Sequence, residues 1–202
     1  EYCLKNDIPL DIVDPTVNFE ISNELINFYK IKSSTYFNNA KYSSAYFMDG
    51  EHSFETVLND LQYIHSIHYN NIIPFCIFIH DTSWPCAYRD LYYKGSKHYS
   101  ESKSALGTSP WEESLTVNGW GAESQCFSQK ETDHQTNNGV LSAIESFNEL
   151  HPQYKFLSIP SIYGLTLIFN PSLLSDKQKT IFKFFEDSLN YFSEFLRILE
   201  YN

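Results

Sequence analysis

The sequence of 202 residues predicts an α/β fold, in which a doubly wound, mostly parallel sheet carries helices on its faces. Short apolar runs alternate with segments of helical spacing through the first 81 residues. The third run, "IIPFCIFIHD" at 72–81, is apolar on both faces, as is typical of a central parallel strand. An order of strand, helix, strand, helix, strand indicates parallel strands that are joined by crossover helices.

The first half of the chain begins with two predicted strands and a helix between them. "LDIVDP" at 10–15 predicts a strand that ends at Asp14, and "SAYFMDG" at 44–50 predicts a second strand that ends at Asp49. Between them, "NFEISNELINFYKI" at 18–31 has apolar residues at helical spacing and predicts a helix.

A second helix is predicted before the third strand, within "SFETVLNDLQYIHSIHY" at 53–69. Ser53 is suited to the N-cap position of this helix. The apolar residues that follow repeat every three or four positions and form one face of an amphipathic helix: Phe54, Val57, Leu58, Leu61 and Ile64.

The second half of the chain completes the predicted fold. Residues 94–136 are polar, rich in serine and punctuated by glycine, which predicts a long loop or lid inserted into a single domain of residues 1–202. A helix is expected at 138–151, and two strands around a turn at 154–171, the last of them antiparallel. From residue 172 the spacing predicts a long C-terminal helix, whose aromatic side chains either cover the sheet or form a homodimer interface.

Composition excludes some classes of partner. The formal net charge of -11 argues against a protein that binds nucleic acid or an anionic membrane surface. No apolar run approaches the roughly 20 residues of a membrane helix. The cysteines lack the spacing of a zinc site, which indicates the reduced thiols of a cytoplasmic protein: Cys3, Cys76, Cys86 and Cys126.

Each of the three early strands is predicted to end in an aspartate, namely Asp14, Asp49 and Asp81. Ligands of parallel α/β sheets bind beyond the carboxyl ends of the strands, so these acids are candidate site residues. An acid in this position can accept hydrogen bonds from ribose hydroxyls, which is one role for Asp14; by itself, however, Asp14-Pro15 is more typical of a simple turn.

Asp49 and Asp81 could converge on one Mg²⁺ ion, which prefers oxygen ligands. His80 or His52 could add a nitrogen ligand or act as a general base. Either histidine alone is better explained as a structural residue, whereas the combination of Asp49, His80 and Asp81 favours a functional site. The following loop supplies candidate substrate-binding residues, although an ion pair with Asp90 is the better explanation for Arg89 and the tyrosines could simply pack: Trp84, Arg89, Tyr92 and Tyr93.

"AYFMDGEHSFETVLNDL" at 45–61 and "FIHDTSWPCAYRDLYY" at 78–93 resemble the class I S-adenosylmethionine-dependent methyltransferases, in particular the branch of small-molecule and sugar O-methyltransferases. "NNGVLSAIESF" at 137–147 and "IPSIYGLTLIF" at 159–169 are similar to the closing helix and strand pair of that branch. The resemblance extends over nearly the whole chain and implies a Rossmann-like sheet, S-adenosylmethionine as cofactor and a hydroxyl group as methyl acceptor.

The resemblance also implies roles for individual residues. Asp14 would bind the cofactor ribose, and Ser33 and Ser34 would lie at the turn that contacts adenine. Asp49 would belong to the cofactor site and, with Asp81, would hold Mg²⁺ or orient the acceptor. The catalytic residues would be His80, Asp81 and His52.

The family has a first strand and a glycine-rich turn ahead of the helix that "EYCLKN" at 1–6 would finish. We therefore expect that residue 1 is not the natural N-terminus. We also expect the strands that end at Asp14 and Asp49 to lack the strand that usually lies between them.

The sequence leaves competing functions open. A degenerate methyltransferase fold could serve as a binding or assembly module, with the C-terminal helix as its interface. A metal-dependent hydrolase or hydroxylase is a weaker alternative, because the sequence has no GxSxG elbow and no HExxH metal box.

Overall fold

The computed structural model describes residues 2–18, 22–39, 42–69, 73–93, 107–109, 112–116, 125–127, 137–159 and 163–200. Most of the predicted loop at 94–136 lies outside these residues. Within it the structure describes three short strands, β6 (Gly107–Ser109), β7 (Glu112–Thr116) and β8 (Gln125–Phe127).

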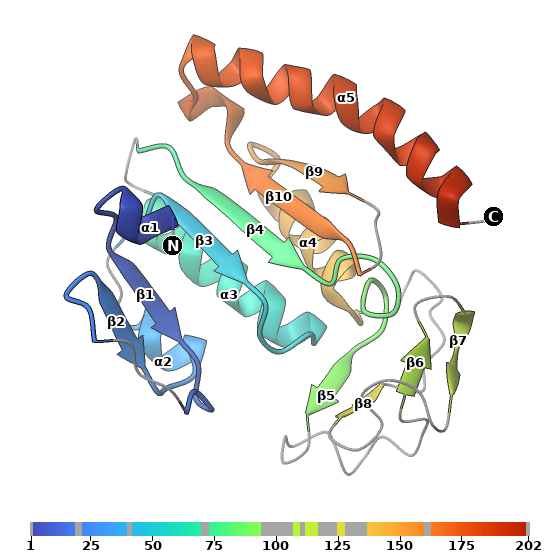
Figure 1. The fold of residues 1–202 in the computed structure, drawn as a ribbon, viewed down its shortest axis with the longest axis horizontal. Helices are drawn as coiled ribbons and strands as arrows, with labels where there is room; N and C mark the ends of the chain where they lie inside the picture. Colours follow the sequence, from blue (N-terminus) through green and yellow to red (C-terminus); the bar gives the residue numbers. More distant parts are fainter. Residues whose placement is uncertain are drawn as a thin grey trace.

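A four-stranded mixed sheet forms the centre of the molecule (Figure 1). Its strands, in spatial order, are β3 (Ala45–Met48), β4 (Cys76–His80), β10 (Leu165–Phe169) and β9 (Lys155–Ile159). β3 and β4 run parallel, while β10 is antiparallel to both of its neighbours. The predicted α/β class and the antiparallel C-terminal strand are confirmed, whereas the sheet is mixed and not mostly parallel, because β10 lies between β4 and β9 and runs antiparallel to both.

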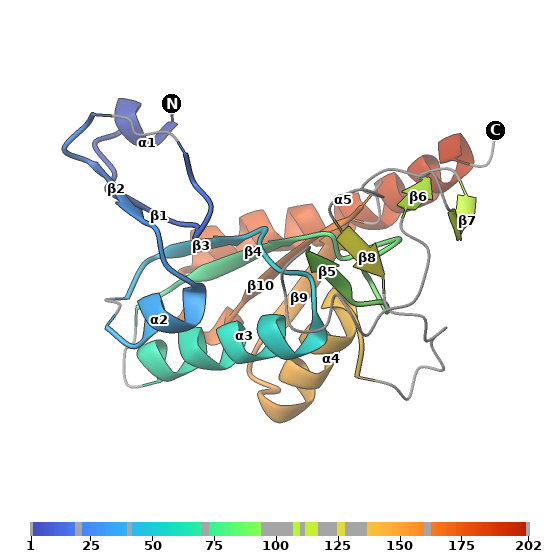
Figure 2. The same cartoon turned by 90° about the horizontal axis from the view of Figure 1, so that it is seen from below.

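Two helices pack side by side on one face of this sheet, α3 (Phe54–His68) and α4 (Val140–Leu150) (Figure 2). Both begin and end within two residues of the predicted positions, because their apolar residues repeat at the helical period. The side chains buried between the helices and the sheet include Leu61, Ile64, Ile77, Ile79, Ile144 and Phe147.

The expected helix at 18–31 is wrong where the structure describes it, because residues 26–29 form strand β2 (Ile26–Tyr29). β2 pairs in parallel with β1 (Leu10–Val13). Asn23 starts the strand with a local turn, in which its Oδ1 accepts a hydrogen bond from the backbone N–H of Leu25 at 2.9 Å. Side chain–backbone bonds of this kind compete with helix formation.

β1 and β2 form a sheet of their own, separate from β3. Helix α2 (Ser33–Phe37) joins this small sheet to α3. The Tyr36 hydroxyl on α2 donates to Asp11 Oδ2 on β1 at 2.5 Å, and the Phe37 ring stacks on Tyr63 of α3 with centroids 6.0 Å apart.

The remaining elements lie at the periphery. α1 (Tyr2–Lys5) precedes β1, and β5 (Leu91–Tyr93) pairs with β8. After β10, the 3-10 turn η1 (Pro171–Leu173) leads into α5 (Asp176–Glu200), which contacts β9 and stacks Phe182 on Phe169. Among the helices that the structure describes, none has the length and apolar character required to cross a membrane.

Candidate functional site

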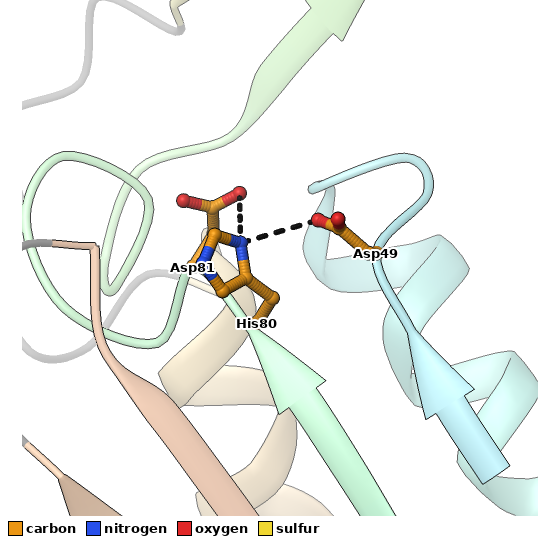
Figure 3. Close-up of side chains that lie close together, drawn as sticks. All are labelled: Asp49, His80 and Asp81. Atoms are coloured by element: carbon orange, nitrogen blue, oxygen red, sulfur yellow. Dashed lines mark ion pairs between the residues drawn. The ribbon is translucent and has the colours of Figure 1, made fainter. Parts of the chain in front are cut away.

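The candidate site lies where the adjacent parallel strands β3 and β4 end (Figure 3). Their register pairs Met48 with Ile79, so Asp49 follows β3 directly beside His80 and Asp81. Asp81 has a φ of 59°, in the left-handed region that is open mainly to glycine, asparagine and aspartate. This conformation turns the chain at the strand end and leaves the Asp81 side chain at the site.

Asp49, His80 and Asp81 each offer a ligand atom, and these atoms all lie within 4.8 Å of one another. His80 Nδ1 is 3.2 Å from Asp49 Oδ1 and also 3.2 Å from Asp81 Oδ2. The structure therefore brings together the three residues whose combination the sequence favoured as functional.

His52 adds a second imidazole to this group. Its Nε2 lies 2.8 Å from Asp81 Oδ2 and 3.6 Å from Asp49 Oδ1. Within the described part of the chain, neither His52 Nε2 nor His80 Nδ1 makes a hydrogen bond of acceptable geometry, although both atoms are buried. The two imidazole nitrogens thus lie close to the two carboxylates, but no N–H points directly at a carboxylate oxygen as a hydrogen bond requires.

The site is electrostatically coupled. Burial by itself would lower the pKa of His52, but the carboxylates of Asp49 and Asp81 outweigh this effect and raise the pKa to about 9. The His52 imidazole in turn lowers the pKa of Asp49, against the opposing effect of partial burial. Positive charge beside Asp49, from a protonated imidazole or a bound cation, therefore favours its carboxylate form.

The loop that carries His52 is held from a distant part of the chain. The His52 carbonyl accepts a hydrogen bond from the Leu91 N–H at 3.2 Å. The next peptide N–H, that of Phe54 at the start of α3, donates to Asp90 Oδ1 at 2.7 Å. Ser53 occupies the predicted N-cap position but makes no capping bond, so Asp90 supplies the cap instead.

Asp90 also fixes the start of α4. Its Oδ1 accepts a second bond from the Gly139 N–H at 2.7 Å, and its Oδ2 accepts from the Tyr92 hydroxyl at 2.7 Å. Tyr92, a predicted substrate-binding residue, thus supports the framework. Tyr93, predicted for the same role, lies closer to the site, with its hydroxyl 3.4 Å from His52 Nδ1.

The other predicted substrate-binding residues pair with one another. The Arg89 guanidinium lies over the Trp84 ring, 5.4 Å from its centroid, a geometry of cation–π contact. Their loop packs on α4, where the N–H groups of Val140 and Leu141 donate to the carbonyls of Cys86 and Ala87. The loop therefore has a defined position next to the site.

The predicted cofactor-binding residues Asp14, Ser33 and Ser34 lie at the end of β1 and on α2, apart from the Asp49 group. Asp14 Oδ1 accepts bonds from the Thr16 N–H at 2.6 Å and the Thr16 hydroxyl at 2.7 Å, which is the turn that the sequence also allowed. Figure 1 shows β1, β2, β3 and β4 pointing the same way, so Asp14 and Asp49 both follow carboxyl ends of strands.

The sequence interpretation missed Asp60, a buried acid on α3. Burial, opposed by a hydrogen bond with Ser33 and reinforced by the nearby charge of Glu51, raises the pKa of Asp60 to about 6. Its spacing from Val57 and Ile64 on the buried face was the available signal, since a carboxylate there is unusual.

Comparison of the chain with family models, with curated proteins and with solved structures gave no match.

Proposed function

We propose that the protein is an S-adenosylmethionine-dependent methyltransferase that transfers a methyl group to a hydroxyl of a sugar or another small molecule. The observation that carries this proposal is the convergence of Asp49, His52, His80 and Asp81 at the ends of adjacent parallel strands. The carboxyl ends of parallel strands are where α/β proteins bind ligands.

The arrangement of the sheet supports the proposal. β10 lies antiparallel beside β4, as the resemblance to methyltransferases implies. In the proposed Rossmann-like, doubly wound arrangement, β1 and β2 lie on the side of the site that binds the cofactor. Helix α5 is the long C-terminal helix of this arrangement. In this arrangement Asp14 binds the cofactor ribose through Oδ2, since Thr16 already occupies Oδ1.

The protein side chains would act mainly by positioning. Asp49, His80 and Asp81 would hold a divalent cation. His52 Nε2, which like His80 Nδ1 lacks a hydrogen bond among the described residues, lies beside the same carboxylates. When bound, the cation lowers the pKa of an acceptor hydroxyl. Holding that oxygen in line with the methyl group contributes to catalysis through orientation. A histidine that does not bind the cation would accept the proton of the hydroxyl.

The acceptor would bind on the side of the site that faces β5 and the preceding loop. Tyr93 stands next to His52 there, and the Trp84–Arg89 pair gives the loop a rigid aromatic surface. Tyr92 contributes through Asp90 and not through the acceptor.

Calorimetric titration with S-adenosylhomocysteine, with and without Mg²⁺, tests this function. We expect binding in the micromolar range, weakened in Asp14→Ala and unchanged in Asp187→Asn, an exposed acid on α5 that serves as the control. The titration is made with this chain. Absence of binding would refute the proposal.

An assembly module is the second candidate, and the exposed apolar face of α5 favours it. Phe184 is 71% exposed, and Ile181 and Phe185 are also exposed. This function predicts a dimer that dissociates when Phe184 and Phe192 are changed to serine, together with no cofactor binding. Phe192 belongs to the aromatic residues of the predicted C-terminal helix, and its side chain lies outside the described residues. Sedimentation velocity distinguishes the two candidates when read alongside the calorimetry.

A further inference from the structure

The cluster at the ends of β3 and β4 offers two imidazole nitrogens in addition to two carboxylates. We propose that Asp49, His52, His80 and Asp81 together bind one late first-row transition-metal ion, represented by Zn²⁺, and not Mg²⁺. The metal site follows from the geometry alone, whereas its use in methyl transfer rests on the proposed function.

The distances between the ligand atoms fit a single ion. Neighbouring ligands at bonds of about 2.1 Å are separated by about 3.0 Å in octahedral and about 3.4 Å in tetrahedral geometry. His80 Nδ1 is 3.2 Å from a carboxylate oxygen of each aspartate, and His52 Nε2 is 2.8 Å and 3.6 Å from the same two oxygens. These four nitrogen–oxygen separations lie close to the expected values, and the ligand atoms of Asp49, His80 and Asp81 all lie within 4.8 Å of one another.

The buried nitrogen of His52 points to a missing ligand. His52 is only 5% exposed, and its Nε2 has no hydrogen-bond partner among the described residues, although it is directed between the two carboxylates. A simple ion pair would place an N–H in line with a carboxylate oxygen. Buried nitrogens without such a bond, close to two carboxylates, are the arrangement expected of metal ligands.

The surroundings of His52 fix the ring in the orientation that a ligand needs. Tyr93 Oη lies 3.4 Å from His52 Nδ1, so Nδ1 can carry the proton and donate it to Tyr93 while Nε2 keeps its lone pair. The Leu91 N–H holds the backbone of the same residue. This outer contact is of the kind that metal-binding histidines usually make.

The donor set selects the class of metal. Mg²⁺ and Ca²⁺ prefer oxygen ligands, whereas imidazole suits Zn²⁺ and other late transition metals. Two carboxylates neutralise the charge of a divalent ion, so the site would be formally neutral in its partly buried position. Because both imidazoles are ligands in this proposal, neither would be the general base of the methyl transfer, and the proton of the acceptor hydroxyl would leave to water.

The backbone at Asp81 orients its side chain. Its φ of 59° lies in the left-handed region, which aspartate adopts more readily than most residues with a side chain. The conformation places one Asp81 oxygen within 3.2 Å of both imidazole nitrogens. Asp81 is therefore the residue around which the site is assembled.

Metal titration of the chelator-treated full chain tests the proposal. We expect one tight equivalent of Zn²⁺ by calorimetry, a visible absorption band with Co²⁺, and no displacement of Zn²⁺ by Mg²⁺ at comparable concentration. Loss of an outer-shell partner weakens binding about 10- to 100-fold, so loss of a ligand in His52→Gln or Asp49→Asn should weaken it more than about 100-fold.

A matched control is provided by His151→Gln. The His151 ring lies next to α4, with its centroid 3.9 Å from that of His65 on α3 and the two planes tilted by 37°. The two rings form another pair of imidazoles, so this variant reports adventitious binding. Zn²⁺ affinity should not change in this variant. Zinc-edge X-ray absorption of the wild-type protein should show two imidazole ligands.

Unchanged Zn²⁺ affinity in a folded His52→Gln and in Asp49→Asn would overturn the proposal, as would displacement of Zn²⁺ by equimolar Mg²⁺. Circular dichroism checks folding, and Asp49→Asn decides if His52→Gln does not fold, because the Asp49 side chain is 51% exposed. Zn²⁺ binding without S-adenosylhomocysteine binding would leave the metal site correct and the methyltransferase function wrong. S-adenosylhomocysteine binding without Zn²⁺ binding would leave the methyltransferase function standing and the metal site wrong.

Discussion

Asp90 connects both helices that frame the site, so its replacement is the most direct test of the framework. It is buried, and its carboxylate accepts hydrogen bonds from the N–H groups of Phe54 and Gly139 and from the Tyr92 hydroxyl, each at 2.7 Å. It therefore caps α3 and α4 at once and ties both to β5. We expect Asp90→Ala to destabilise the protein strongly.

The magnitude follows from these bonds. A hydrogen bond to a charged group contributes about 1.5 to 3 kcal/mol, and Asp90→Ala removes three of them while leaving two backbone donors without their acceptor. Relief of the carboxylate's own desolvation offsets part of the loss, so we expect about 3 to 5 kcal/mol. That is a large share of the roughly 5 to 15 kcal/mol that stabilises a typical domain.

Asp90→Asn separates the capping role from the charge. The amide oxygen can still accept from Phe54 and Gly139, and the amide nitrogen can donate to the Tyr92 oxygen, so we expect a loss of only about 1 to 2 kcal/mol. Tyr92→Phe, which removes one bond, should cost about 1 kcal/mol.

Urea unfolding followed by circular dichroism measures the free energy of unfolding of all three variants. An unchanged dependence of this free energy on urea concentration shows that the variants still unfold in the same two-state transition. Metal affinity of Asp90→Asn adds a second measurement, because the cap positions the loop that carries His52. A loss below about 1 kcal/mol in Asp90→Ala, or an equal loss in Asp90→Ala and Asp90→Asn, would contradict the double-cap explanation.

Two further predictions concern burial and backbone conformation. The pKa of Asp60 rises from an ordinary 3.8 to about 6, so the folded protein holds this proton more tightly and its stability falls as the pH rises from about 4 through 6. Asp60→Asn removes this penalty and should stabilise the protein by up to about 3 kcal/mol at pH 8, with no gain near pH 4, as thermal unfolding across pH would show. A gain that does not depend on pH would contradict the assigned pKa. Gly164→Ala should cost about 2 to 4 kcal/mol, because Gly164 has a φ of 74° and a Cβ there would lie 2.4 Å from Ser83 Oγ. Gly50→Ala, whose Cβ would meet nothing within 4 Å, is the control and should change stability by less than about 0.5 kcal/mol.

The sequence predicts best where one period persists over many residues. The apolar face of α3 repeats through four turns, and β4 is flanked by a helix on one side and an abrupt polar boundary at Asp81 on the other. The segment at 18–31 misled because its apolar residues fit a helix, whereas pairing with β1 and the turn at Asn23 favour a strand for residues 26–29. Short apolar runs are ambiguous in this way, and the tertiary partner decides.

Asp49 and Asp81 could be predicted as neighbours because parallel strands bring their carboxyl ends to one edge. The position of His52 could not, because it depends on a loop fixed by Leu91 and Asp90, about 40 residues further along the chain. The role of Asp90 as a cap for two helices could not be predicted from the sequence either, because the residues that it joins are distant along the chain.

Strand register and loop contacts each fix a different part of the site. The register of β3 and β4 sets Asp49 beside His80, and a shift of one residue would move one side chain by about 3.3 Å and turn it to the other face of the sheet. The carboxylates are thus fixed by the sheet, whereas His52 is fixed by a loop whose anchors, Leu91 and Asp90, lie beyond the third strand end. A ligand that bridges Asp49, Asp81 and His52 would therefore join the sheet to the loop, and its binding should stabilise the start of α3 as well as the site itself. Amide hydrogen exchange at Phe54 and Leu91 measures this coupling, and equal exchange with and without Zn²⁺ would show that the loop is already rigid without the ion.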